Sequence, residues 1–195
     1  MDWVAVGLSQ DLRSGMAMPG HINGFDLALW RSVSGQLHAW GDRCPHRGMR
    51  LSHGFVRGEA LSCIYHGWQY GDDGGCTAIP AHPKLTPPKT ICATTYGCIE
   101  GDGLIWVALS DTAQAPPSLP AATPVRSLQI NASQAETAAH FGDPDAVIIT
   151  ESDTTIVLQP VDAAHCIVHV LAKADPKAAS RWIESQRAII EGPAA

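Results

Sequence analysis

Short apolar stretches separated by glycine-containing or polar turns fill the first part of the chain, up to about residue 110. Stretches of four to eight residues with this pattern predict β-strands, and no long helical periodicity interrupts them. Ser34-Gly35 and residues 71–75 are turn signals between such stretches. The pattern predicts an antiparallel, mainly β domain with strands at Trp3–Leu8, Phe25–Arg31, Leu37–Trp40, Ala60–Cys63, Gln69–Tyr70, Ile91–Thr95 and Gly103–Leu109.

A segment rich in proline and alanine, residues 115–124, ends this pattern and predicts an extended linker. Beyond it, further strands are predicted, and Asp175-Pro176 offers a helix N-cap and a first-turn proline ahead of a helical repeat that Gly192 follows. We expect a mainly β domain at 1–112, a linker at 113–126 and a small α+β annex at 127–195 that ends in a C-terminal helix. The annex strands are expected at Ala146–Thr150, Thr154–Gln159 and Cys166–Leu171, and the repeat consists of Ala179, Trp182, Ile183, Gln186 and Ile190.

The composition is typical of a globular protein, with 45% hydrophobic and 16% charged residues in a chain of 195. A net charge of −6 argues against nucleic-acid binding and would suit docking to a basic patch on a redox partner. No run of about 18 apolar residues predicts a membrane span, and the first residues do not resemble a secretory signal. We therefore expect a cytoplasmic protein, in which six cysteines favour metal binding over a disulfide framework.

Two short motifs each combine a cysteine with a histidine. Cys44-Pro45-His46 is separated by sixteen residues from Cys63-Ile64-Tyr65-His66. Two thiolates on one iron and two imidazoles on the other complete a [2Fe-2S] cluster of mixed ligation, because two sulfides already bridge the irons. A Cys2His2 zinc site has the same number of ligands, but a zinc finger pairs two cysteines on one side and two histidines on the other. We therefore predict that Cys44, His46, Cys63 and His66 bind a [2Fe-2S] cluster.

The block from Cys44 through Tyr70 resembles a known family. It begins CPHRGMRLSHGFVRG, ends YHGWQY, and is similar to the Rieske domain of Rieske non-heme iron oxygenases, especially the vanillate O-demethylase and phthalate dioxygenase type. The resemblance runs from about Trp3 to Leu109. It implies a Rieske [2Fe-2S] domain, fed by a flavin reductase or a ferredoxin, that passes electrons to an iron site where dioxygen is activated.

Departures from related Rieske proteins bear on the chemistry. Met49 and Tyr65 stand where the Rieske proteins of respiratory bc complexes carry a pair of cysteines, so that disulfide cannot form. Trp68, expected to pack over the cluster loop or in the core, replaces the hydroxyl-bearing serine of that class. Fewer hydrogen bonds to the sulfides predict a reduction potential of roughly −150 to −100 mV, near the low end of the Rieske range. The other cysteines of this half, Cys76, Cys92 and Cys98, are expected to be small buried residues.

A second metal site is the weaker hypothesis. Relatives in this family carry a catalytic domain with a mononuclear iron bound by two histidines and a carboxylate. Asp162, His165 and His169 match a D-x2-H-x3-H pattern, but their flanks favour a β-hairpin and the distant acidic ligand has no candidate. The stretch 137–141 resembles another family segment, with Thr137 and Asp145 at two of the expected ligand positions, which suggests a decayed iron site. Mononuclear Fe(II) is therefore not expected, and no catalytic residue is assigned.

Three functions remain open from the sequence. The first is an electron-transfer component that passes single electrons from a flavin reductase or ferredoxin toward the catalytic subunit of an oxygenase. The second is a compact oxygenase that oxidises an aromatic or methoxy substrate at its own iron. The third is a non-catalytic subunit of a mixed oxygenase oligomer, in which the shortened annex serves for assembly.

Overall fold

The fold consists of three antiparallel sheets and two α-helices, and the computed structural model describes residues 2–111 and 114–192. The first sheet contains β1 (Trp3–Leu8), β2 (Ala17–Ile22), β3 (Phe25–Arg31), β4 (Leu37–Gly41), β9 (Thr95–Gly101) and β10 (Leu104–Ala108). The second contains β5 (Phe55–Arg57), β6 (Ala60–Ser62), β7 (Gln69–Tyr70) and β8 (Cys76–Ala78). The third contains β11 (Thr123–Ile130), β12 (Ile148–Glu151), β13 (Thr154–Pro160) and β14 (Cys166–Ala172). The helices are α1 (Gln134–His140) and α2 (Pro176–Glu191), with 3-10 turns η1 (Ser9–Asp11) and η2 (Leu51–His53).

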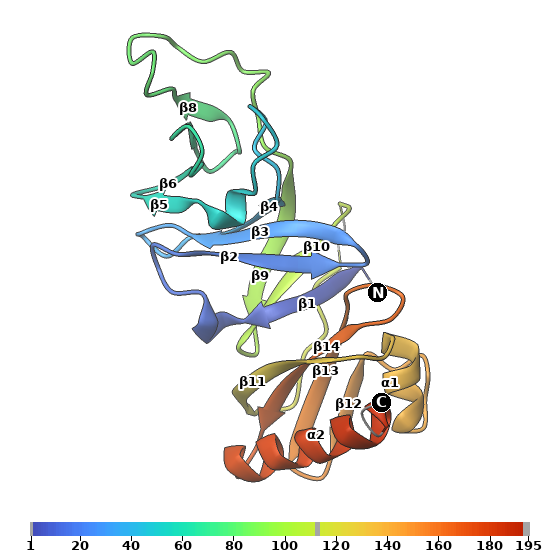
Figure 1. Cartoon of the computed structure of the whole chain (residues 1–195). Helices are drawn as coiled ribbons and strands as arrows, with labels where there is room; N and C mark the ends of the chain where they lie inside the picture. The colour runs from blue at the N-terminus through green and yellow to red at the C-terminus, as the bar shows by residue number, and fades with distance from the viewer. Residues whose placement is uncertain (1, 112–113, 193–195) are drawn as a thin grey trace.

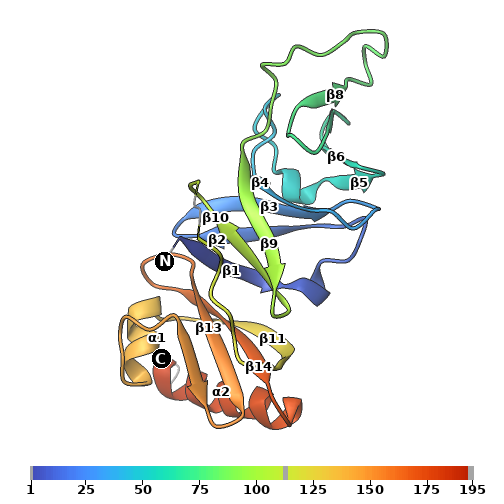
Figure 2. The same ribbon diagram turned by 180° about the vertical axis from the view of Figure 1, so that it is seen from behind.

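The six-stranded sheet, in the order β1-β10-β9-β4-β3-β2, forms the middle of the molecule (Figure 1). Its strands β3, β4 and β10 carry the fully buried side chains of Trp30, Trp40 and Trp106, so the sheet contributes most of the aromatic core. The small sheet β5-β6-β7-β8 lies at one end, and the sheet β11-β14-β13-β12 lies at the other (Figures 1 and 2). The prediction of a mainly β antiparallel fold that ends in a helix is confirmed.

Several details of the first half differ from the sequence prediction. Strands β5 and β8, of three residues each, were not predicted. The strand expected at Ile91–Thr95 is wrong, because β9 begins only at Thr95 and the preceding residues pair through the single bridge from Gly75 to Cys92. Strand β2 was not predicted, because Pro19 and Gly20 interrupt its pattern. It pairs with β3 along its whole length nonetheless.

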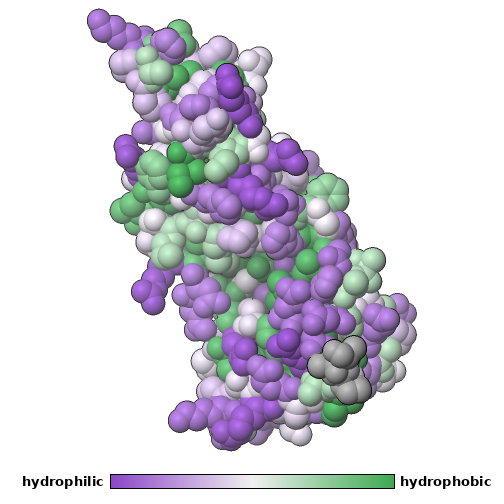
Figure 3. All heavy atoms as spheres, in the orientation of Figure 1, coloured by the Kyte–Doolittle hydropathy of each residue, from purple (hydrophilic) through white to green (hydrophobic). Residues whose placement is uncertain are grey.

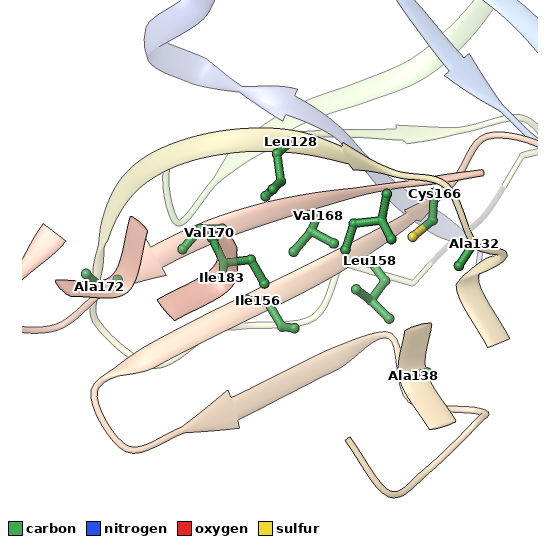
Figure 4. Packing of buried hydrophobic residues seen from close by; sticks show 12 residues of the cluster. Leu128, Ala132, Ala138, Ile156, Leu158, Cys166, Val168, Val170, Ala172 and Ile183 are labelled. Carbon is green, nitrogen blue, oxygen red and sulfur yellow. The ribbon is translucent and has the colours of Figure 1, made fainter. Parts of the chain in front are cut away.

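The third sheet packs one face against helix α2 and α1 (Figure 4). Ile156 and Leu158 of β13 face this core, as do Val168 and Val170 of β14, while Ile183 reaches it from α2. Helix α2 begins where the sequence predicted it: the carboxylate of Asp175 accepts hydrogen bonds from two backbone N–H groups of the first turn.

The start of this sheet lies inside the segment that the sequence placed in the linker. Residues 123–126 belong to β11, which pairs with β14. Helix α1 was also not predicted, although Ser133 and Glu136 form a capping box at its start. The start of β11 could not be predicted because residues 115–124 are rich in proline and alanine. Helix α1 could not be predicted because it contains only seven residues.

The opposite face of the third sheet packs against β1 and β10. Trp3 and Trp106 meet Val157 and Leu171 in one buried cluster. Backbone bonds join the two parts as well, from Asn23 N–H to the Pro160 carbonyl at 3.0 Å and from Gly24 N–H to the Val161 carbonyl at 2.7 Å. Within the described residues, no helix is long and apolar enough to cross a membrane.

Candidate metal centre

The two cysteine–histidine motifs form loops that close in the same way. In the first loop, Cys44 N–H donates to the Met49 carbonyl and Gly48 N–H donates to the Cys44 carbonyl, each at 2.8 Å. The second loop repeats this pattern, from Cys63 to Trp68 and from Gly67 to Cys63, each at 2.9 Å. Gly48 and Gly67 both have a φ of +70°, a conformation in which glycine avoids the clash of a Cβ atom.

The two loops place their cysteines in the interior and their histidines nearer the surface. Cys44 and Cys63 are 4% and 1% exposed and share one buried cluster. His46 is half-buried and His66 is exposed, and their ring centroids lie 4.7 Å apart. The four residues predicted from the sequence are therefore brought together, with the thiols inside and the imidazoles at the surface.

The sulfur atoms have hydrogen-bond donors beside them. The Tyr70 hydroxyl lies 3.0 Å from Cys44 Sγ, in a fully buried position on β7. Burial raises the pKa of the Cys63 thiol, and Cys44 raises it further, while the backbone N–H groups of Tyr65 and His66 lower it. Burial and the Cys44 bond raise the pKa of Tyr70, which keeps its proton available for donation. No pattern in the sequence indicates this contact between Tyr70 and Cys44.

Aromatic rings flank both imidazoles. Trp68 stacks on His46, with ring centroids 4.0 Å apart and planes 7° from parallel. Tyr65 stacks on His66 at 3.9 Å. Partial burial, His66 and the Arg47 guanidinium together lower the pKa of His46, which favours the neutral imidazole that a metal needs. Trp68 also packs against the buried cluster that contains both cysteines, so each of the two positions left open by the sequence, over the loop and in the core, describes it in part.

A buried carboxylate anchors the base of the first loop. Asp42 accepts hydrogen bonds from the backbone N–H and from the hydroxyl of Ser52, both at 2.7 Å. Arg50 donates to Asp42 at 3.3 Å and to Asp26 at 2.8 Å. Asp42 and Ser52 lie on either side of the Cys44–Gly48 loop, so these bonds fix the distance between its two ends.

The donor set fits a two-iron cluster. Each iron of a mixed-ligand [2Fe-2S] cluster takes two protein side chains of one kind, and the structure pairs thiol with thiol and imidazole with imidazole. Among the described residues, no group of three or more His, Cys, Asp or Glu could hold one metal ion. Of the remaining cysteines, Cys76 and Cys98 are half-buried, whereas Cys92 is exposed, so the expectation of burial is wrong for Cys92.

The weaker hypothesis of a mononuclear iron site gains no support from the contacts. His165 Nδ1 pairs with the Asp162 carboxylate at 2.8 Å on the exposed turn between β13 and β14. His169 is fully buried and both of its ring nitrogens are bonded, Nδ1 to Ser127 at 2.8 Å and Nε2 to Gln159 at 2.9 Å. A metal would have to displace these bonds to bind His165 and His169 together.

The segment suspected as a decayed iron site is helix α1 and its C-terminal turn. Thr137 is buried and lies 3.2 Å from Cys166 Sγ. His140 is exposed and its Nε2 lies 2.8 Å from the Gln186 side chain of α2. Asp145 is exposed beyond the helix. The structure gives this segment a packing role.

Comparison with known proteins identifies a Rieske [2Fe-2S] domain over residues 2–94. Oxidoreductase NdmD of Pseudomonas putida is 38% identical over 118 residues, which are 60% of this chain and 20% of NdmD. A 4beta-methylsterol monooxygenase of Methylococcus capsulatus is 40% identical over 117 residues, which are 58% of this chain and 31% of that protein. The chain thus spans less than a third of the length of these relatives.

Solved structures resemble the whole chain in fold. An NdmA mutant from Pseudomonas putida CBB5 with theobromine superposes with a TM-score of 0.80 at 19% identity, covering 98% of this chain and 81% of NdmA. Apo dicamba monooxygenase gives a TM-score of 0.77 over 97% of this chain and 84% of its own.

NdmA is a longer protein than this chain. A 74-residue match is 38% of this chain but only 21% of NdmA, so NdmA is nearly twice as long. The superposition therefore relates this chain to a longer one. At this identity the superposition shows a likeness of fold, and the interpretation of residues 127–195 as a shortened oxygenase catalytic domain stays a prediction.

Proposed function

With residues 2–94 belonging to the Rieske [2Fe-2S] domain family, we propose that the chain carries single electrons from a reductase toward a non-heme iron oxygenase site. The observation that carries this proposal is the sorting of ligands, with two buried thiols behind two imidazoles at the surface. Outward transfer of an electron needs a short path from metal to partner, and the imidazole side provides it.

Within this proposal, Cys44 and Cys63 would hold one iron of the cluster, and His46 and His66 would hold the other. When bound, such a cluster accepts and releases one electron at a potential above that of an all-cysteine cluster. The Tyr70 hydroxyl and the N–H groups of the second loop stabilise negative charge on the sulfurs. Trp68 shields His46 from water, while the exposed edge of His66 is left for a partner.

The partners are a flavin reductase or a ferredoxin as donor and an oxygenase subunit as acceptor. Relatives carry names of the matching kind, such as the iron-sulfur subunit TsaM1 of a toluene-4-sulfonate monooxygenase system from Comamonas testosteroni, 36% identical over 91 residues. A division of the chain into a Rieske domain at 1–112, a linker and an annex belongs to the same proposal. A cytoplasmic location stays a prediction.

A second candidate is a non-catalytic subunit of a mixed oxygenase oligomer. The observation that favours it is the superposition of the annex, together with the rest of the chain, on chains of monooxygenases. Co-purification with a full-length oxygenase chain would support this candidate, whereas a stable monomer that exchanges electrons in solution would contradict it.

Iron and sulfide quantitation on anaerobically purified protein tests the main proposal. We expect two irons and two sulfides per chain and a reduced-state EPR signal of a mixed His/Cys cluster. Cys63→Ser and His66→Ala should abolish the signal, whereas the matched changes Cys98→Ser and His82→Ala should keep it.

Other metal contents of the purified protein would contradict the proposal. A single zinc would refute the cluster. A third iron that binds after Fe(II) reconstitution and is lost in His165→Ala would instead favour the compact oxygenase.

A further inference from the structure

The end of the molecule that carries the metal centre is basic, although the chain as a whole is acidic. Residues 43–91 contain six lysines and arginines against three acidic residues, whereas the net charge of the whole chain is −6. The remaining residues are therefore more acidic than the chain average. The cations of this segment are Arg43, Arg47, Arg50, Arg57, Lys84 and Lys89, and the anions are Glu59, Asp72 and Asp73.

Most of these cations are free to meet a partner. Arg50 is held by Asp26 and Asp42, and Arg57 lies 4.7 Å above the Phe55 ring. The other four form no ion pair with any residue that the structure describes, and all four are exposed: Arg43, Arg47, Lys84 and Lys89. Unpaired surface cations gain more from an approaching anion than cations that already have a carboxylate partner.

An apolar area lies at the same end of the molecule, and Arg47 is close enough to His46 at its edge to act on the charge of that ring. A shallow hollow of about 250 Å³ is lined by both candidate imidazoles and by Trp68, Ile79, Ala81 and His82. Beside it, three large apolar side chains point into solvent: Ile64 is 54% exposed, Tyr65 60% and Leu85 52%. Figure 3 shows hydrophobic and strongly hydrophilic atoms side by side at this end of the molecule. We call the hollow, these three side chains, Arg47 and Lys84 the tip surface, and we add Lys89, which lines a second hollow together with Asp73.

We propose that the tip surface docks an acidic electron-transfer protein whose own redox site lies in an apolar patch within a rim of carboxylates. This rests on the proposed function, and it reverses the expectation drawn from net charge, which pointed to a basic partner. The apolar centre excludes water over the imidazole edges, and the rim cations set orientation and encounter rate. A polyanion such as nucleic acid fits less well, because the exposed centre is apolar and the rest of the chain repels it.

Electron transfer measured against ionic strength tests the proposal. The cluster-loaded protein is mixed in a stopped-flow instrument with a reduced plant-type [2Fe-2S] ferredoxin, which is an acidic donor. Raising the ionic strength from about 0.01 M to about 0.1 M shortens the Debye length from about 30 Å to about 10 Å and should slow the reaction about tenfold. With cytochrome c, a basic acceptor, the reaction of the reduced protein should not slow as salt is added.

Charge-reversal variants show which part of the surface causes the salt dependence of the electron-transfer rate. The triple variant Arg47→Glu, Lys84→Glu, Lys89→Glu should lose about tenfold in rate with ferredoxin at low salt, and most of its salt dependence. The control Lys173→Glu, Lys177→Glu, Arg181→Glu changes net charge equally on exposed residues at the far end, and it should react like the parent. The double variant Lys84→Glu, Lys89→Glu leaves the cluster loops untouched and should show an intermediate loss.

Each remaining outcome contradicts the docking proposal. Equal slowing in the tip variant and the far-end control would mean that only net charge matters. Self-association through the tip surface, seen as a dimer that the triple variant abolishes, would assign this surface to a second copy of the chain. A normal cluster spectrum with no salt dependence would refute docking while leaving the electron-transfer function intact, whereas a protein without a cluster would refute both.

Discussion

At the scale of single residues, the metal centre depends on side chains that bind no metal. Tyr70 brings a hydroxyl to Cys44 Sγ, and Trp68 covers His46. Asp42 ties the first loop to Ser52. These side chains fix the direction of the ligands and the charge around them, which are the properties that tune a bound cluster.

Removal of the Tyr70 hydroxyl should lower the reduction potential. A hydrogen bond to a thiolate stabilises the reduced form, and a net value of about 1 kcal/mol corresponds to about 40 mV for one electron. We expect Tyr70→Phe to shift the midpoint downward by about this amount in a redox titration followed by visible absorption. Tyr96→Phe, a tyrosine on β9 outside the centre, should leave the midpoint unchanged, and an equal shift in both variants would contradict the assignment.

Buried His169 should make the stability of the fold depend on pH. Burial lowers its pKa to about 4, against about 6.5 in the unfolded chain, so the unfolded state takes up the proton first as the pH falls. The stability is complete above pH 6.5 and decreases toward pH 4, by about 2–3 kcal/mol at pH 4.5. In urea titrations, the unfolding free energies of wild type and His169→Gln should differ less at pH 4.5 than at pH 7. A constant difference would mean that the pKa of His169 is the same in the folded and the unfolded chain.

At the scale of elements, the two cluster loops are built alike in different settings, since the first leads from β4 to β5 in another sheet and the second joins the paired strands β6 and β7. Each loop starts at a buried cysteine and returns through a glycine with positive φ. The second loop is the more tightly packed one, since a Cβ atom on Gly67 would lie 3.2 Å from Pro80 Cγ. Pro80 lies between Ile79 and Ala81, which line the hollow, so this contact joins the second loop to the lining of the hollow.

Gly67→Ala should therefore destabilise the fold more than a comparable glycine change elsewhere. Gly58 has a similar φ of +60°, but a Cβ atom added there would meet no other atom within 4 Å, which makes Gly58→Ala the matched control. The left-handed conformation costs about 1–2 kcal/mol in either variant. We expect an additional loss in Gly67→Ala, measured by urea unfolding, and a lower cluster content. Equal losses of unfolding free energy in the two variants would show that Pro80 can move away from the added Cβ atom at little cost.

Much of this architecture could be predicted from the sequence, for identifiable reasons. Strands such as Phe25–Arg31 have continuous apolar runs, and the cysteine–histidine spacing restricts the chemistry to a few metals. Strand β2 could not be predicted, because its pairing with β3 overrides the local effect of Pro19 and Gly20. The Tyr70 bond could not be predicted either, because it joins residues 26 positions apart through the fold.

At the scale of the whole molecule, the annex is joined to the first sheet by a buried contact as well as by the chain. Val157 and Leu171 pack on Trp3 and Trp106. The His169 network crosses the same boundary, since Nε2 also lies 3.3 Å from the Ala5 carbonyl. A surface of this kind should make the two parts unfold together.

Leu171→Ala should weaken both parts at once. Leu171 is fully buried in this contact, and removing its side chain should cost about 2–5 kcal/mol. Cluster absorption reports on one end of the molecule and helical circular dichroism on the other, and the two urea transitions should coincide in wild type. Ile189→Ala, at a position 63% exposed on α2, should change the midpoint little. Two separate transitions in the wild type would contradict the coupling.

The distribution of ligands between the loops has a consequence for assembly. Each loop supplies one thiol and one imidazole, so on the proposed ligand set neither loop alone can complete the coordination of either iron. Incorporation of iron and sulfide would then succeed only after both loops have reached their places. A chain in which this end has not yet folded would therefore not retain the cluster.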